Sequence, residues 1–202
     1  GLGGRSAIIS VLCVSDGSLY AGGNFTQAGS TNVNSVAQWN GIEWSGLGEG
    51  VMTRGEFRAL TATTNSIYAG GEFFNLGGAA ISNVACWNGS NWIALRNGVN
   101  GTVRAAITHR NHLYVGGDFN QADGLPARRI AKWNGSNWKP LGTGVDFSVT
   151  SLTVFRDQIV VGGSNANATA ASVARWTGQY WKGLVSANHR ISVRHVHGLR
   201  IA

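Results

Sequence analysis

The chain has 202 residues, of which 43% are hydrophobic, 30 are glycine and only two are proline. This composition is typical of one β-rich domain with a sizeable core and many tight turns. The sequence contains no run of 18 apolar residues, which excludes a transmembrane helix, and its first residues lack the pattern of a signal peptide. The formal net charge is +7, and its whole basic excess falls in residues 101–202, which hold twelve basic and four acidic side chains.

One sequence pattern occurs four times along the chain. An apolar run ends in a diglycine, and W-x-G-x-x-W follows about sixteen residues later. The copies read LYAGGNF from Leu19, IYAGGEF from Ile67, LYVGGDF from Leu113 and IVVGGSN from Ile159, and their first glycines are 48, 46 and 46 residues apart. A period in this range with strand-like units predicts an all-β fold, a β-propeller whose repeats are four-stranded antiparallel blades.

The second copy illustrates how each blade is predicted to form. Residues 57–63 alternate as a first strand, Asn65 and Ser66 supply a turn, residues 67–71 form a second strand, and residues 84–87 form a third. The diglycine permits positive φ or a close approach between neighbouring blades. Asn88-Gly89, between Trp87 and Trp92, predicts a type I′ hairpin to the fourth strand. We expect the eight tryptophans, two in each copy, to pack within and between blades.

The repeats predict blades over residues 5–49, 50–97, 98–144 and 145–187, and a partial blade over residues 188–202. Residues 1–4 are interpreted as the tail of a preceding fourth strand, and residues 191–197 as a fifth first strand. The predicted architecture is therefore a segment of a larger propeller, with a closed ring of four blades as the alternative. Open edges are expected to pair with neighbouring blades or to self-associate.

The repeats resemble those of kelch-like propellers. The variant with G-G-[DE]-F and W-[DN]-G-x-x-W is similar to the repeats of fungal cortical polarity-marker ectodomains and of related bacterial surface proteins. Glu72-Phe73 and Asp118-Phe119 match this pattern, Asn24-Phe25 matches with an amide in place of the acid, and Ser164-Asn165 departs from it. The resemblance implies an extracellular, non-catalytic propeller that presents loops and blade faces to protein partners.

Five N-x-[ST] acceptor sequences favour an extracellular glycoprotein: Asn24, Asn88, Asn100, Asn134 and Asn167. Asn88 and Asn134 lie in the W-N-G-S turn, where the hairpin by itself explains an asparagine. Asn100 and Asn167 lie in predicted loops without this explanation. Glycan occupancy would therefore distinguish an extracellular protein from an intracellular one.

Two basic clusters are candidate contacts for an anionic partner: Arg128, Arg129 and Lys132, and then Arg190, Arg194 and Arg200. Solvated charges that protect a sheet edge explain the same residues, and no nucleic-acid-binding module accompanies them. One alternative function is therefore a basic scaffold subunit of an intracellular assembly. A lectin-like, carbohydrate-binding propeller is a second alternative.

No catalytic, cofactor or metal site is predicted. His195 and His197 lie on one face of a predicted strand without an evident third metal ligand, and Cys13 and Cys86 are expected to be buried thiols. Equivalent acidic positions in adjacent blades do not form the facing pair that a glycosidase requires. We expect function instead in the loops between second and third strands, residues 26–35, 75–82, 121–129 and 166–171.

Overall fold

The computed structural model describes residues 1–4, 7–51, 55–164 and 172–184, and this part of the chain is all β. It contains four four-stranded antiparallel sheets, in each of which the strands pair in chain order. The predicted propeller blades are therefore confirmed. The described residues include no helix that could span a membrane.

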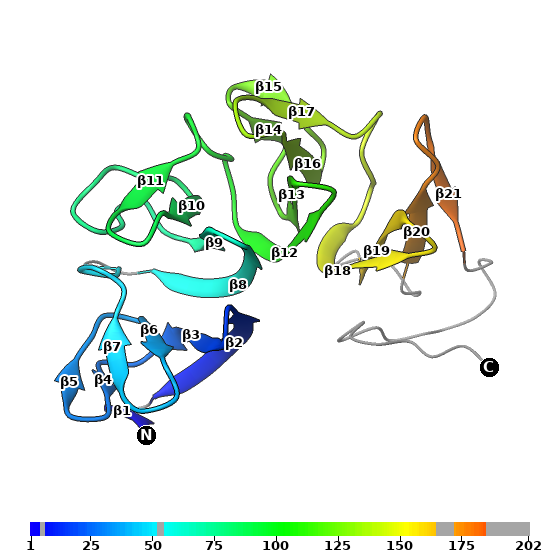
Figure 1. Cartoon of the computed structure of the whole chain (residues 1–202). Coiled ribbons are helices and arrows are strands. Elements are labelled where there is room, and N and C mark those ends of the chain that lie inside the picture. Colours follow the sequence, from blue (N-terminus) through cyan, green and yellow to red (C-terminus); the bar gives the residue numbers. More distant parts are fainter. Residues whose placement is uncertain (5–6, 52–54, 165–171, 185–202) are drawn as a thin grey trace.

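The four blades follow one another in an arc with their first strands toward its inner side (Figure 1). Blade 1 consists of β2 (Ile8–Ser15), β3 (Ser18–Asn24), β6 (Val36–Trp39) and β7 (Trp44–Gly46). Blade 2 consists of β8 (Glu56–Thr63), β9 (Ser66–Glu72), β10 (Val84–Trp87) and β11 (Trp92–Ala94). Blade 3 consists of β12 (Val103–His109), β13 (His112–Gly117), β16 (Ile130–Trp133) and β17 (Trp138–Pro140). Blade 4 consists of β18 (Ser148–Phe155), β19 (Gln158–Ser164), β20 (Ser172–Trp176) and β21 (Trp181–Gly183).

The two glycines of each diglycine serve different contacts, and none of the eight has positive φ. A Cβ on the first glycine would collide with the next blade: at Gly70 it would lie 2.4 Å from Val103 Cγ1. A Cβ on the second glycine would collide within its own blade: at Gly71 it would lie 2.0 Å from the Glu56 carbonyl oxygen. Close approach, rather than backbone conformation, therefore requires both glycines.

The prediction of type I′ turns in the W-x-G-x-x-W segments is wrong. Trp87 pairs directly with Trp92, so four residues connect the strands, and only Gly89 among them has positive φ. The Asn88 side chain closes the turn, because its Oδ1 accepts hydrogen bonds from the backbone N–H groups of Ser90 and Asn91. In blade 4 the Thr177 hydroxyl takes over this position and accepts from the Tyr180 N–H. The asparagine is thus selected as a side-chain cap.

Two-residue turns with positive φ at both positions lie instead between first and second strands. They are formed by Asp16-Gly17, Arg110-Asn111 and Arg156-Asp157. In blade 2 Thr63 pairs with Ser66, so the turn is one residue earlier than the predicted Asn65 and Ser66. Type I′ geometry is therefore present in this protein, but in the connections nearest the inner strands.

Short strands outside the blades pair within the loops, and in blade 1 also with the segment that precedes the first strand. β1 (Leu2–Gly3) pairs with β4 (Gln27–Ala28), which pairs with β5 (Thr31–Asn32), and β14 (Gln121–Ala122) pairs with β15 (Leu125–Pro126). The pairing of Leu2 with Ala28 matches the bridge between Val99 and Ala122. Residues 1–4 therefore correspond to a segment that leads into a blade, and their assignment to a fourth strand is wrong because they pair with a loop. The predicted partial blade at 188–202 lies outside the described residues.

The core is distributed over the junctions between blades. One buried cluster joins blades 1 and 2, a second joins blades 2 and 3, and a third joins blades 3 and 4. The phenylalanine after each matching diglycine, at positions 25, 73 and 119, is fully buried. Cys86 is a buried free thiol, as expected, whereas the free thiol of Cys13 is only partly buried, and burial raises the pKa of both. At each described junction, neighbouring blades therefore bury the faces that they turn toward each other.

Tryptophan indoles connect consecutive blades by a repeated hydrogen bond. The second tryptophan of a blade donates its Nε1–H to the carbonyl oxygen of the leucine that follows the fourth strand of the preceding blade. Trp92 donates to Leu47 at 2.9 Å, Trp138 to Leu95 at 2.7 Å and Trp181 to Leu141 at 2.9 Å. The indole thereby satisfies a carbonyl group at the end of the strand, and the two rings of each pair lie in tilted contact.

Candidate partner-binding site between blades 2 and 3

A pocket of about 340 Å³ lies where blade 2 meets blade 3. Its walls come from the blade 2 loop, the segment that connects the two blades, and the blade 3 loop. The lining residues are Phe74, Ser82, Asn83, Asn97, Gly98, Val99, Asn100, Gln121, Asp123 and Gly124. Two of the loops in which function was expected, 75–82 and 121–129, therefore contribute to the same pocket.

Phe74 gives the pocket an apolar rim that the other described blades lack. The residue after the buried phenylalanine is Thr26 in blade 1 and Asn120 in blade 3. Phe74 is 70% exposed, whereas its neighbour Phe73 is fully buried. Exposure of a phenylalanine ring is unfavourable for an isolated chain, and at this loop position blade 2 has one where blades 1 and 3 have polar residues, which is evidence for a contact surface.

Asp123 is a second departure from the repeat. Seven residues after the first glycine of the diglycine, blades 1 and 2 have Gly29 and Gly77, both with φ near 60°. Blade 3 has Asp123 in the same left-handed conformation, with φ 52°. A residue with a Cβ costs more than glycine in this region, although aspartate tolerates it better than most. The carboxylate is therefore present despite a local cost.

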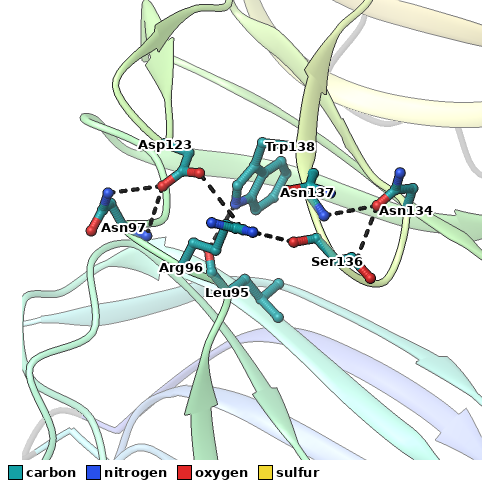
Figure 2. Close-up of polar contacts among 8 residues, drawn as sticks. All are labelled: Leu95, Arg96, Asn97, Asp123, Asn134, Ser136, Asn137 and Trp138. Carbon is teal, nitrogen blue, oxygen red and sulfur yellow. Dashed lines mark hydrogen bonds and ion pairs between the residues drawn. The ribbon is translucent and has the colours of Figure 1, made fainter.

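Arg96 is the third departure and meets Asp123. The leucine after the fourth strand is followed by glycine in Gly48 and Gly142, with φ 61° and 58°, whereas Arg96 has φ 57° at this position. Arg96 Nε donates to the Ser136 carbonyl oxygen at 2.7 Å and lies 3.8 Å from Asp123 Oδ2 (Figure 2). Two unfavourable backbone positions at one junction thus hold oppositely charged groups side by side.

The same carboxylate fixes the connecting segment. Asp123 Oδ1 accepts hydrogen bonds from the backbone N–H of Asn97 at 3.3 Å and from Asn97 Nδ2 at 2.8 Å (Figure 2). The nearby Trp138 of blade 3 donates its indole N–H to the carbonyl oxygen of Leu95, which follows blade 2. The segment between blades 2 and 3 is therefore connected to blade 3 at successive residues, which orders one wall of the pocket.

Two asparagines order the remaining polar walls. Asn100 Oδ1 accepts from the backbone N–H groups of Asn120 and Gln121 at 3.0 and 2.9 Å, and its Nδ2 donates to Asn120 Oδ1. Asn83 is buried, accepts from the Phe73 N–H and donates to the Val99 carbonyl oxygen. These contacts form a preorganised polar surface next to an exposed aromatic ring, the usual composition of a binding pocket.

Phe74, Arg96 and Asp123 were not among the residues predicted from the sequence. Their signal is a comparison of equivalent positions between repeats, because each replaces a small or polar residue that the other described copies carry at that place. In a repeat protein the other copies show what the fold alone requires. Residues that differ from them at some cost to the fold therefore indicate function.

The predicted glycosylation sites in the described residues are all exposed: Asn24, Asn88, Asn100 and Asn134. The Oδ1 atoms of Asn88 and Asn134 cap their turns, as described above for Asn88. Asn100 has a structural role that the sequence did not reveal, since its side chain connects the segment between blades to the blade 3 loop. Asn167 lies outside the described residues.

The predicted basic cluster is partly neutralised. Arg129 Nη1 lies 3.2 Å from Asp118 Oδ1, and Arg104 Nε contacts the other carboxylate oxygen at 2.5 Å. Burial raises the pKa of Asp118, but the Ser148 hydroxyl and the two guanidinium groups outweigh it and lower the pKa overall. Arg128 is exposed and Lys132 is half-buried on β16. Arg190, Arg194 and Arg200 lie outside the described residues, as do His195 and His197.

Within the described ranges, no group of three or more His, Cys, Asp or Glu side chains is placed to hold a metal ion. His109 Nε2 lies 3.0 Å from Asp157 Oδ1, and Arg110 also contacts this carboxylate. These contacts join the short turns of blades 3 and 4. They lie at a different place in the fold from the pocket lined by Phe74 and Asp123.

Comparison with known proteins supports the fold. The sequence matches no known family and no curated protein. The structure is similar to the β-propeller domain of the Trilobed protease from Pyrococcus furiosus, with TM-score 0.59 and 14% identity, over 89% of this chain and 55% of that chain. It is similar to YCF48 bound to D1 peptide, with TM-score 0.55 and 15% identity, over 88% of this chain and 53% of that chain.

A third similar structure is the GH74 enzyme of Niastella koreensis, with TM-score 0.57 and 20% identity, over 90% of this chain and 29% of that chain. The chain thus spans about half of the length of the first two structures and less than a third of the GH74 enzyme. These likenesses concern the backbone arrangement, since all identities are low. Together with the four repeated sheets, they establish that the chain has a β-propeller fold.

Proposed function

We propose that this chain is a non-catalytic, extracellular or cell-surface β-propeller that binds a protein partner at the pocket between blades 2 and 3. The observation that carries the proposal is the convergence of Phe74, Arg96 and Asp123, three departures from the repeat, at one junction. The fold itself requires none of them, because the other described copies form the same structure with different residues.

The composition of the pocket suits an extended peptide segment. Phe74 offers an exposed ring to an apolar side chain of the partner, and Ser82, Asn97 and Gln121 provide polar side chains that can pair with a peptide backbone. Because the pocket walls are hydrogen-bonded before binding, little ordering cost opposes association. The similar YCF48 structure is bound to D1 peptide, which is compatible with peptide binding by this type of fold.

The polar groups of the pocket support a binding role rather than catalysis. Of the described lining residues, Asp123 alone is a carboxylate, and it is engaged by Asn97 and Arg96. Acid–base hydrolysis of a glycoside by the usual mechanism requires two carboxylates that face each other across a substrate. The side chains in this pocket are arranged to hold loops and to present a surface.

A peptide library displayed on phage tests the proposal. We expect the wild-type chain to enrich peptides with an apolar residue, and Phe74→Ala to lose at least about tenfold in affinity for them, since truncation of a central aromatic contact typically costs this much. Phe155→Ala is the matched control, because Phe155 is also an exposed phenylalanine but lies at the end of β18 in blade 4.

Equal loss in both variants, or no enrichment, would contradict the proposed site. Saturable binding to a glycan array that Phe74→Ala abolishes would contradict the peptide ligand and support the lectin-like alternative. The extracellular location has a separate test, which is glycopeptide mass spectrometry of the native protein. Glycans on Asn24, Asn88, Asn100, Asn134 or Asn167 support it, and uniformly unmodified asparagines favour the intracellular scaffold.

A further inference from the structure

The outer face of blade 1 carries an apolar patch on β2. Ile9, Leu12 and Val14 are all exposed, and Leu12 is 57% exposed. Their counterparts in the bulged pairing with the second strand are Phe57, Leu60 and Ala62 of blade 2. Phe57 is fully buried and Leu60 is only 7% exposed. Within the described residues, no blade covers this face of blade 1.

The three described junctions show what fits on this face of a blade. Each places the first-strand side chain against the first glycine of the preceding blade, as Phe57 meets Gly22, Val103 meets Gly70 and Val149 meets Gly116. In each junction the second tryptophan also donates its indole N–H to a leucine carbonyl oxygen of the preceding blade. The surface that complements this face of blade 1 is therefore the face of a blade that carries the first glycine and the leucine carbonyl and contacts the following blade.

Blade 1 has the matching donor for this contact. Trp44 is the second tryptophan of its blade, and among the described residues no carbonyl accepts a hydrogen bond from its indole. The ring is half-buried beside Trp39. Blade 1 thus presents both the apolar side chains and the indole that blades 2, 3 and 4 use to join a preceding blade.

Blade 4 presents the matching acceptor. Leu184 follows β21 as Leu47, Leu95 and Leu141 follow the fourth strands of blades 1 to 3. Those three leucines are buried, whereas Leu184 is 48% exposed. Gly162 occupies the first-glycine position of this blade. Within the part of the chain that the structure describes, one half of the repeated contact is therefore at blade 1 and the other half at blade 4.

We infer that blade 4 of one copy packs onto blade 1 of a second copy, so that two arcs associate head to tail. The interface repeats the contact between consecutive blades within one chain. Blade 1 contributes Leu12 and Trp44, and blade 4 contributes Gly162 and Leu184. A head-to-tail contact forms either a closed ring or an open filament, depending on the rotation between copies. The chain covers 55% of the similar β-propeller domain, so two arcs of this size would span about as much as that domain. The inference does not depend on the proposed peptide site.

Light scattering coupled to size-exclusion chromatography tests it with the full chain. We expect a particle of about twice the 21.3 kDa chain mass at high concentration, with a concentration-dependent dissociation. Leu12→Asp and Leu184→Asp should each yield monomer, because each puts a charge into one half of the interface. Leu125→Asp is the matched control: Leu125 is as exposed as Leu12 but lies in the blade 3 loop.

Mixing the two disrupted variants identifies the head-to-tail arrangement. A Leu12→Asp copy keeps an intact blade 4 and a Leu184→Asp copy keeps an intact blade 1, so the mixture should recover dimer through one unmodified interface. Circular dichroism checks that both variants stay folded. A wild-type monomer at all concentrations, a dimer that survives Leu12→Asp, or a mixture that remains monomeric would each overturn the inference.

Discussion

At the scale of single residues, glycine is the informative residue type in this chain, for two separate reasons. In the diglycines it allows backbone and side chains to approach within distances that a Cβ forbids. In the loops and connecting segments it adopts positive φ, as Gly48 and Gly77 do. The exceptions, Arg96 and Asp123, are visible only against this background of glycines, and they mark the candidate site.

The diglycine contact gives a direct stability prediction. In Gly70→Ala the new Cβ would lie 2.4 Å from Val103 Cγ1 and 3.0 Å from its Cβ, and the stiff valine has little freedom to move. We expect the free energy of unfolding to fall by roughly 1–3 kcal/mol, as in other overpacked cores. Urea titration followed by tryptophan fluorescence measures the change.

Gly183→Ala is the control for this substitution. Gly183 also lies in a strand and has no positive φ, and a Cβ added to it would meet no heavy atom within 4 Å. Its replacement should therefore change the stability by less than about 0.5 kcal/mol. If both substitutions cost the same, the loss would reflect glycine in a strand generally, and the close approach of blades 2 and 3 would not be the reason for the diglycine.

At the scale of elements, the fourth strands are connected to neighbouring blades by the tryptophan indoles. β17 is only three residues long, so its own sheet supplies few hydrogen bonds. The bond from Trp138 Nε1 to the Leu95 carbonyl oxygen is buried and crosses from blade 3 to blade 2. Short outer strands are thus stabilised by the neighbouring blade as well as by their own.

This bond can be measured by comparing two tryptophans of one pair. Trp138→Phe removes one of the two donors to the Leu95 carbonyl oxygen, which keeps the bond from the Gly98 N–H, so we expect a cost of about 0.5–1.5 kcal/mol beyond the loss of ring size. Trp133→Phe is the matched control, because Trp133 is similarly buried and is the other ring of the same Trp133–Trp138 contact, without such a bond. Equal losses of unfolding free energy in the two variants would show that ring packing, and not the hydrogen bond, joins the blades.

At the scale of the whole molecule, the repeat period was sufficient to predict the blades. The strand over residues 84–87 and the packing role of the tryptophans followed from alternation and repetition. The turn geometry did not follow, because Asn-Gly suits both a type I′ turn and the side-chain-capped turn that Asn88 forms. The pairing of residues 1–4 with a loop could not be read either, since two residues carry no periodicity.

The candidate site was only partly predictable, for a related reason. Periodicity identifies what the repeats share, and so it located the loops that carry the pocket. Phe74, Arg96 and Asp123 are what the repeats do not share, and their proximity depends on how neighbouring blades pack. For the basic cluster, closeness in sequence was misleading. Arg128, Arg129 and Lys132 are neighbours in the chain, yet Arg129 forms an ion pair with Asp118, which follows β13.

Stability should be unequal along the arc, because a repeat protein gains it from each blade and from each junction between blades. Blades 2 and 3 each pack on both faces within the chain, whereas blade 1 exposes Leu12 and Val14. In the Leu12→Asp variant, where association is absent, amide hydrogens of β9 and β13 should therefore exchange more slowly than those of β3. Mass-resolved hydrogen exchange over peptides that cover these strands measures the order.

In the wild-type protein at dimer-forming concentration the protection of β3 should rise toward that of β9, because the second copy covers blade 1. Equal exchange of all three strands in the variant would instead mean that the four blades unfold as one unit, and that the junctions couple them more strongly than local packing indicates.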